Sequence, residues 1–331
     1  MGDVAMTVPV LQCFCQNNPE VKITVVSRKF FKPLFQELPN VSFLEADVKG
    51  VHKGFLGLLK LAKEIKTLPI DAVADLHNVI RSKVITGLLR FSGIPSETLD
   101  KGRAEKKAIT HAHGQEIEPL KAMQERYADV FEKLGYPLNL SKVELLSRKP
   151  LTPKLLTLVG KTPKKLVGIA PFAAFKSKMY PLESMKNVLK NLTASGKYTL
   201  LLFGGGKQEE TILSSWEIGY KDTINVAGKL SFEEELALIS NLDVMVSMDS
   251  GNGHLAANYG IPVITLWGVT HPYAGFVPFG QPMEHQIVSD RKQYPLIPTS
   301  IYGNKFPEGY ENVMRSIEPN TIVQKVERVL S

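Results

Sequence analysis

The sequence predicts an α/β protein with two consecutive domains, each built on a parallel sheet. Short apolar or β-branched runs alternate with amphipathic helical patterns through most of the 331 residues, as in repeated βαβ units. The alternation stops once, over residues 136–165, where Pro, Lys and Ser accumulate. Because the length suits two domains of ordinary size, we place the domains at residues 1–150 and 151–331.

The charge balance narrows the classes of partner. The chain has 40 basic and 33 acidic residues, and residues 1–150 hold 22 and 17 of them. This excess favours anionic ligands or an anionic membrane surface. Nucleic acid is the weakest candidate, because the sequence has no basic helix and no aromatic residues interleaved with basic ones.

The two cysteines and the hydropathy indicate a reduced, cytoplasmic chain. Cys13 and Cys15 are the only cysteines, and they lack the additional ligands of a zinc site. No apolar run is long enough to span a membrane.

The first domain is expected to open with a helix over residues 4–15, which begins late or bends at Pro9. In such a fold a strand normally precedes this helix. We expect that strand to lie upstream of Met1, or the chain to be truncated there. The elements that follow are expected as strands at 21–27, 41–44 and 71–76 and helices at 30–38, 54–66, 79–91 and 119–134.

Residues 97–118 are polar and are expected to form an exposed loop. The segment contains a basic cluster and two histidines: Lys101, Arg103, Lys106, Lys107, His111 and His113. It could become ordered around a ligand, but a solvated run of charges is favoured.

The second domain repeats the alternation. Ser231-x-x-Glu234 forms a capping box at the start of one helix. The expected strands are 166–170, 198–203, 223–226, 244–248, 262–267 and 285–288, and the expected helices are 182–192, 208–218, 231–240, 254–259 and 321–330. Two such domains predict a ligand cleft between them, at the carboxyl ends of the strands.

Three strand ends in this domain carry features suited to phosphate. Residues 249–253 form a Gly-rich turn between a strand and a helix, which presents unpaired N–H groups. Lys176 and Lys178 follow the first strand, where a lysine could hold phosphate as a point charge. The run at 204–207, GGGK, is not a Walker A loop, but its glycines allow close approach to the backbone. Alternatively, these are an ordinary capped turn and surface lysines.

In the first domain, Asp3 and His77 are the candidate bases. Asp3 opens the first helix, so it could cap that helix or act as a general base. His77 follows a strand, where an imidazole could serve as a base or as a structural hydrogen-bonding residue. Asn78 and Arg81 lie close by in the sequence.

Several segments together resemble glycosyltransferase family 9, the heptosyltransferases of lipopolysaccharide assembly. MDSGNGHLAANYGIPVITLWGVTHP at 248–272 resembles its signature of Asp-Ser/Thr-Gly, His, Ala-Ala, Gly-x-Pro and Gly-x-Thr-x-Pro. GDVAMTVPVLQ, DAVADLHNVIRS and KMYP resemble its Gly-Asp loop, its Asp-Leu-x-x-x-x-Arg-Ser segment and its Lys-x-Trp-Pro motif. The matches occur in family order over nearly the whole chain.

The resemblance implies a GT-B fold and an inverting transfer that needs no metal or other cofactor. The first domain would bind a lipid-linked glycan acceptor, and the second a nucleotide-sugar, with ADP-heptose the expected donor. The protein would be a monomer, cytoplasmic and peripheral on the inner face of the inner membrane.

The resemblance also assigns roles to individual residues. Asp3 falls on the proposed general base, and Lys178 on the lysine that contacts the donor phosphates. Asp249 falls in the turn that holds the diphosphate and sugar of the donor. Because like charges repel, we expect it to cap and order the turn rather than to contact phosphate. Further donor contacts fall on Ala173, Ala174, Gly205, Gly206, Ser250, Gly251, Gly253 and His254, and acceptor contacts on His77, Asn78 and Arg81.

The sequence departs from the family at several places. Ala173 and Ala174 lack the hydroxyls often found there, and Tyr180 replaces Trp. Gly206 and Lys207 stand where an acidic residue often follows the second strand. The alternatives are a nucleotide-sugar epimerase of the same fold and a nucleotide-sugar-binding protein that has lost catalysis.

Overall fold

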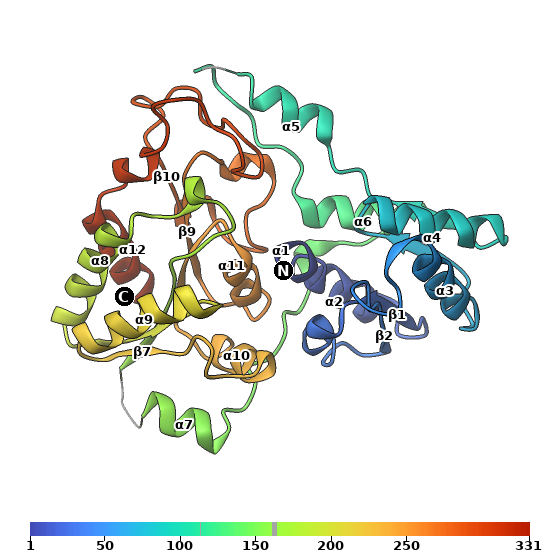
Figure 1. Ribbon diagram of the computed structural model, residues 1–331, viewed down its shortest axis with the longest axis horizontal. Coiled ribbons are helices and arrows are strands. Elements are labelled where there is room, and N and C mark those ends of the chain that lie inside the picture. Colours follow the sequence, from blue (N-terminus) through green and yellow to red (C-terminus); the bar gives the residue numbers. More distant parts are fainter. Residues whose placement is uncertain (113, 161–163) are drawn as a thin grey trace. The chain divides into compact units, whose positions relative to one another are not determined.

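The computed structural model describes residues 1–112, 114–160 and 164–331, which form two compact units (Figure 1). The first unit comprises residues 1, 3–103 and 121–146, and the second comprises residues 2, 104–120 and 147–331. Residues 104–120 thus belong with the second unit, although we expected them in the first domain. His113 and residues 161–163 of the expected connection lie outside the described residues.

The first unit has two separate pairs of parallel strands. β1 pairs with β2, with Ile23 opposite Val41, and β3 pairs with β4, with Val73 opposite Ser96. The strands are β1 (Ile23–Ser27), β2 (Val41–Glu45), β3 (Val73–Asp75) and β4 (Ser96–Thr98). The helices are α1 (Gly2–Ala5), α2 (Val8–Asn17), α3 (Gly54–Lys66), α4 (Ile80–Phe91) and α6 (Met123–Lys133), with 3₁₀ helices η1 (Lys29–Leu34) and η2 (Leu140–Lys142).

Two prolines explain where this unit differs from the expected helices. The helix expected at 4–15 is divided into α1 and α2, and Pro9 lies in the first turn of α2, where its missing N–H costs nothing. The α-helix expected at 30–38 is the shorter 3₁₀ helix η1, which contains Pro33. By contrast, α3 has the expected bounds, because it carries an unbroken amphipathic pattern.

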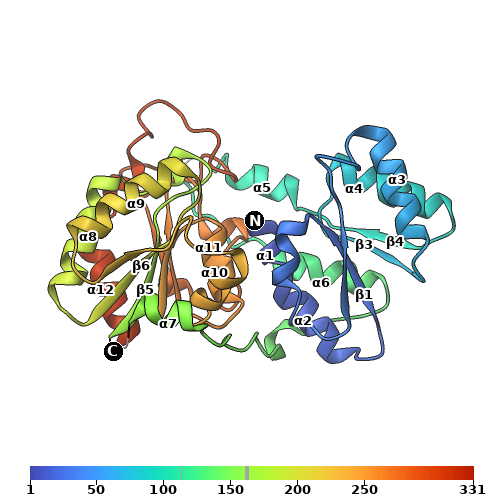
Figure 2. The ribbon, with the colours of Figure 1, turned by 60° about the horizontal axis from the view of Figure 1, so that its bottom comes forward.

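The second unit contains a six-stranded parallel sheet, of which β5 and β6 are labelled in Figure 2. Its strand order is β10-β9-β8-β5-β6-β7. The strands are β5 (Lys165–Ala170), β6 (Tyr198–Leu202), β7 (Thr223–Asn225), β8 (Val244–Met248), β9 (Val263–Trp267) and β10 (Gln286–Val288). Numbered along the chain, this is the doubly wound order 3-2-1-4-5-6, and the order reverses between β5 and β8. Ligands bind such sheets at the carboxyl ends of the strands beside that switch point.

Helices cover both faces of this sheet. Alternate strand residues such as Val167, Leu200 and Val246 form one core with α8, α9 and α12, whereas α11 packs on β8 and β9 from the other face and contacts α10. The helices are α8 (Leu182–Ala194), α9 (Lys207–Gly219), α10 (Phe232–Ile239), α11 (Gly251–Ala257) and α12 (Pro319–Leu330). Short 3₁₀ helices complete the unit: η3 (Lys176–Lys178), η4 (Pro272–Ala274), η5 (Met283–His285) and η6 (Val313–Ser316).

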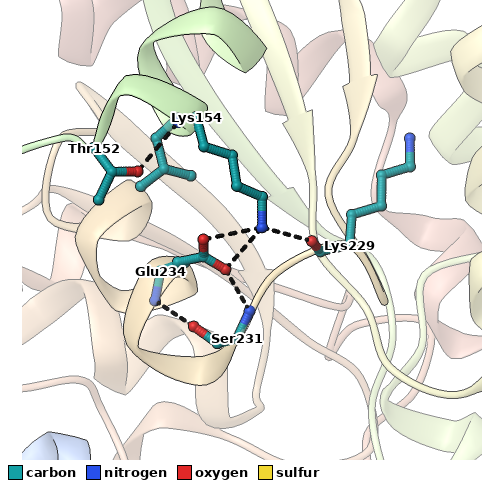
Figure 3. A network of polar contacts seen from close by, with 6 residues as sticks. Thr152, Lys154, Lys229, Ser231 and Glu234 are labelled. Carbon is teal, nitrogen blue, oxygen red and sulfur yellow. Dashed lines mark hydrogen bonds and ion pairs between the residues drawn. The ribbon is translucent and has the colours of Figure 1, made fainter.

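The segment that enters this sheet contains a helix that the sequence analysis missed, α7 (Pro153–Val159). Thr152 caps it by accepting a hydrogen bond from Leu155 N, and Lys154 Nζ lies 2.9 Å from Glu234 Oε1 (Figure 3). Glu234 and Ser231 form the predicted capping box of α10. This capping box therefore also anchors the connecting segment to the second unit.

The segment expected as an exposed loop, residues 97–118, contains regular structure and several buried side chains. It includes β4 and the helix α5 (Arg103–Ile109). The Lys106 side chain is buried, with its ammonium 4.2 Å from the ring centroid of Phe276, and Ile109 and Ile117 pack with Ala274. These buried contacts were not expected, because the apolar and aromatic partners come from a part of the sequence about 160 residues away.

Among the described residues, no helix is long and apolar enough to cross a membrane.

Candidate functional site

A buried ion pair lies at the switch point of the second sheet. Lys178 ends η3, which follows β5, and Asp249 directly follows the adjacent strand β8. The Lys178 Nζ is 2.8 Å from Asp249 Oδ2, and the two side chains are only 14% and 8% exposed. Lys176, the other candidate lysine, is exposed. The structure thus distinguishes two lysines that the sequence placed two residues apart.

Thr270 completes this cluster from a third strand end. Its hydroxyl, on the segment after β9, donates to the same Asp249 Oδ2 at 3.0 Å, and Thr270 is 1% exposed. The expected role of Asp249 as a helix cap is therefore wrong. Its carboxylate instead contacts a cation and a hydroxyl. These partners offset the cost of burying a charge more effectively than the N–H groups at a helix end would. Ser250 takes the N-cap position instead.

The turn after Asp249 contains buried polar atoms without hydrogen-bond partners among the described residues. Ser250 makes no side-chain capping bond. Ser250 Oγ and Asn252 Oδ1 are buried without a hydrogen-bond partner among the residues that the structure describes. The first N–H groups of α11 also have no intrahelical acceptor. Since native proteins rarely leave buried polar atoms unpaired, this concentration suits a polar ligand.

Two other predicted residues of this turn lie within α11. A Cβ on Gly253 would lie 2.7 Å from Ser247 Oγ, so glycine lets α11 pack closely on β8. His254 follows it and is buried. Because α11 has only seven residues, its dipole is small, and a ligand's charge would be met mainly by Lys178.

The structure places an acidic side chain at the end of β6, where the sequence placed only glycine and lysine. Glu209 Oε2 accepts a hydrogen bond from Gly205 N at 2.8 Å, so that N–H is already occupied. Gly206 has a φ of +84° and precedes α9, which explains the glycine there. At the end of β5, Ala173 is half-buried and Ala174 is exposed.

In the first unit, Asp75 organises the loop that carries the predicted acceptor residues. Its Oδ1 accepts hydrogen bonds from the backbone N of His77 and Asn78, each at 2.9 Å. Asn78 has a φ of +47°, and its buried Oδ1 has no partner among the described residues. Arg81 is exposed. The sequence analysis assigned no role to Asp75, which lies at the end of β3.

Asp3, His77 and Lys101 influence one another electrostatically. Partial burial, followed by the charge of Lys101, lowers the pKa of His77, so this imidazole is neutral at pH 7. Burial also lowers the pKa of Lys101, and the Asp3 carboxylate opposes that change. Asp3 is exposed in α1, and its backbone oxygen accepts a bond from Tyr127 Oη at 3.4 Å. Lys101, expected in a solvated loop, thus shares the surroundings of the candidate base.

Within the described ranges, no group of three or more His, Cys, Asp or Glu side chains is arranged to hold a metal ion.

The doubly wound sheet, with a largely buried lysine and unpaired polar atoms at its switch point, has the architecture in which α/β proteins commonly bind nucleotides. Comparison with known proteins gives the family. Residues 58–298 match the model described as glycosyltransferase family 9 (heptosyltransferase). The chain belongs to this family and is a glycosyltransferase, as the resemblance predicted.

Similar proteins support the assignment over the whole length. Lipopolysaccharide heptosyltransferase 2 of Escherichia coli is 24% identical, with 100% of this chain and 96% of that protein covered. The lipopolysaccharide core heptosyltransferase OpsX of Haemophilus influenzae is 24% identical, with 82% and 77% covered.

Solved structures show the same fold. A family 9 glycosyltransferase from Veillonella parvula has a TM-score of 0.76 at 20% identity, covering 100% of this chain and 94% of that one. E. coli heptosyltransferase WaaC with ADP has a TM-score of 0.68 at 20% identity, covering 99% and 97%. The predicted GT-B fold is confirmed.

Proposed function

We propose that this chain transfers a heptose from ADP-heptose to a hydroxyl of a lipopolysaccharide core acceptor, with inversion at the anomeric carbon. The observation that carries the proposal is the buried cluster of Lys178, Asp249 and Thr270 beside the unpaired atoms of Ser250 and Asn252. ADP-heptose is supported by the related solved structures, among them WaaC with ADP-2-deoxy-2-fluoro heptose.

The cluster suits a leaving diphosphate. As the glycosidic bond to the donor breaks, negative charge grows on the phosphate oxygens. Lys178 Nζ and the N–H groups at the start of α11 can stabilise that charge without reorganising, which is where fixed donors are most effective. Asp249 repels phosphate, so we assign it to holding Lys178 through Oδ2.

Glu209 supplies the carboxylate for the nucleoside. In doubly wound sheets an acidic residue near the end of the second strand hydrogen-bonds the ribose hydroxyls, and Glu209 reaches that place after β6. Glu209→Gln should weaken ADP binding roughly tenfold, at the lower end of the range for one hydrogen bond to a charged group. The loss should disappear for 2′,3′-dideoxy-ADP. An equal loss for both nucleotides would contradict this role.

Asp3 is the proposed general base, and His77, Asn78, Arg81 and Lys101 are proposed to bind the acceptor. A carboxylate that takes the hydroxyl proton typically accelerates such a reaction about 10²–10⁴-fold. The basic excess of residues 1–150 supports a cytoplasmic protein that contacts the inner face of the inner membrane.

An acceptor-dependence assay tests the proposal. ADP release from ADP-heptose should require a heptose-deficient core acceptor. The fold alone also accommodates a nucleotide-sugar epimerase, since a putative UDP-N-acetylglucosamine 2-epimerase from Listeria monocytogenes has a TM-score of 0.51 at 11% identity. Conversion of the nucleotide-sugar without acceptor would favour that alternative and contradict transfer.

A further inference from the structure

A tight turn at residues 300–304 packs against Lys178, the lysine proposed to contact the donor phosphates. Ser300 Oγ accepts hydrogen bonds from the backbone N of Tyr302 and Gly303 at 3.3 and 3.0 Å, and it donates to Asn304 Oδ1 at 3.0 Å. Thr299 N donates to Val269 O at 3.0 Å, which fixes the turn to the segment after β9. No sequence motif indicated this turn.

Gly303 leaves the space through which the Lys178 side chain passes. Its φ is +79°, and a Cβ there would lie 2.5 Å from both Cγ and Cδ of Lys178. Such a distance is far inside ordinary van der Waals contact, and the obstructing atoms belong to the part of the lysine that directs its ammonium group. Any side chain at residue 303 would therefore displace Lys178 from its present path.

Ser177, the residue before Lys178, is held by contacts with Gly303 and with the segment that follows β9. Its buried hydroxyl donates a hydrogen bond to Gly303 O. Its backbone oxygen accepts from Val269 N at 3.3 Å, and a Cβ on Gly268 would lie 2.1 Å from that oxygen. Both the backbone and the stem of Lys178 are thus fixed before a ligand arrives, so binding need not order a flexible side chain.

We propose that Gly303 is a positioning residue for donor binding, which acts by holding Lys178 in the rotamer that meets the diphosphate. The proposal rests on the proposed function, in which Lys178 contacts the donor phosphates. It adds the turn at residues 300–304 to that site and requires glycine at residue 303.

The test compares Gly303→Ala with Gly309→Ala by calorimetric titration with ADP and with adenosine. Gly309 has a φ of +86° and no atom within 4 Å of its would-be Cβ, so it reproduces the backbone strain without the clash. Gly303→Ala should weaken ADP binding roughly 10- to 50-fold, within the range expected for loss of a charged hydrogen bond. Adenosine affinity should not change, and Gly309→Ala should bind both ligands like the unaltered protein.

A double-mutant cycle with Lys178→Met separates positioning from general damage. If Gly303 acts through Lys178, the Gly303→Ala change should add little to the loss already caused by Lys178→Met. Should Gly303→Ala fail to fold, Ser177→Ala removes one anchor and should show the same selective, smaller loss for ADP.

Three results would overturn the proposal: ADP affinity in Gly303→Ala equal to that in Gly309→Ala, equal losses for ADP and adenosine, or additive losses in the cycle. If Lys178→Met itself binds ADP normally, the donor site of the proposed function fails as well, which distinguishes the two failures.

Discussion

The charge of Lys178 should account for most of the diphosphate affinity of this protein. Lys178→Met keeps the length and the apolar stem of the side chain but removes the ammonium group. A hydrogen bond to a charged group contributes about 1.5–3 kcal/mol. The dissociation constant of ADP should therefore rise roughly 10- to 150-fold.

The same change should destabilise the unliganded protein. Asp249, 8% exposed, would lose its cation and keep its bond from Thr270. Breaking a buried ion pair costs about 3–5 kcal/mol. Because Thr270 remains and Lys178 is 14% exposed, we expect a value near the lower end of that range.

Isothermal titration calorimetry with ADP at fixed ionic strength, together with thermal unfolding, measures both effects. Lys176→Met is the matched control, because Lys176 is an exposed lysine on the same 3₁₀ helix. The control should bind ADP and unfold like the unaltered protein. Equal ADP affinity in the two variants would refute the assignment of Lys178.

The other predictions concern Thr270, Asp3 and His271. Thr270→Val should lower stability by about 1.5–3 kcal/mol through the lost bond to a buried carboxylate; urea unfolding measures this, and failure of Thr270→Ser to restore stability would contradict it. Asp3→Asn should abolish turnover and leave ADP affinity unchanged; turnover near the normal rate would exclude Asp3 as the base. Burial, aided by the Arg291 charge, lowers the pKa of His271 to about 4. Between pH 6.5 and 4 the unfolded state therefore binds this proton more readily than the folded state, and the free energy of unfolding falls as the pH falls. His271→Asn, which can still accept the bond from Tyr273 N, should remove roughly 2 kcal/mol of that loss by pH 5; an unchanged pH profile of urea unfolding would contradict the titration of His271.

Local patterns were sufficient to predict most of the second unit. Its central strands β6, β8 and β9 are fully buried, so they appear in the sequence as short continuous apolar runs, and β8 (Val244–Met248) has the predicted bounds. The capping box at Ser231 and Glu234 was also predictable, because both partners lie within one helical turn.

Features that depend on distant partners were not predictable from local patterns. The local sequence predicted that Lys106 belongs to a solvated run of charges, but in the structure Phe276 and its neighbours bury it. The candidates Lys176 and Lys178, two residues apart, had no local feature to separate them. The partner that distinguishes Lys178, Asp249, follows a strand about 70 residues later. Gly303 was missed because glycine in a polar loop gives no sign of the side chain that crosses it.

A crystal structure of the protein with bound ADP tests the central assignment most directly. The account predicts that Lys178 Nζ lies within hydrogen-bond distance of a phosphate oxygen, that Ser250 Oγ or an N–H group at the start of α11 donates to the diphosphate, and that Lys178 keeps its contact with Asp249. Well-defined ADP whose phosphates lie away from Lys178 and from residues 250–253 would contradict it.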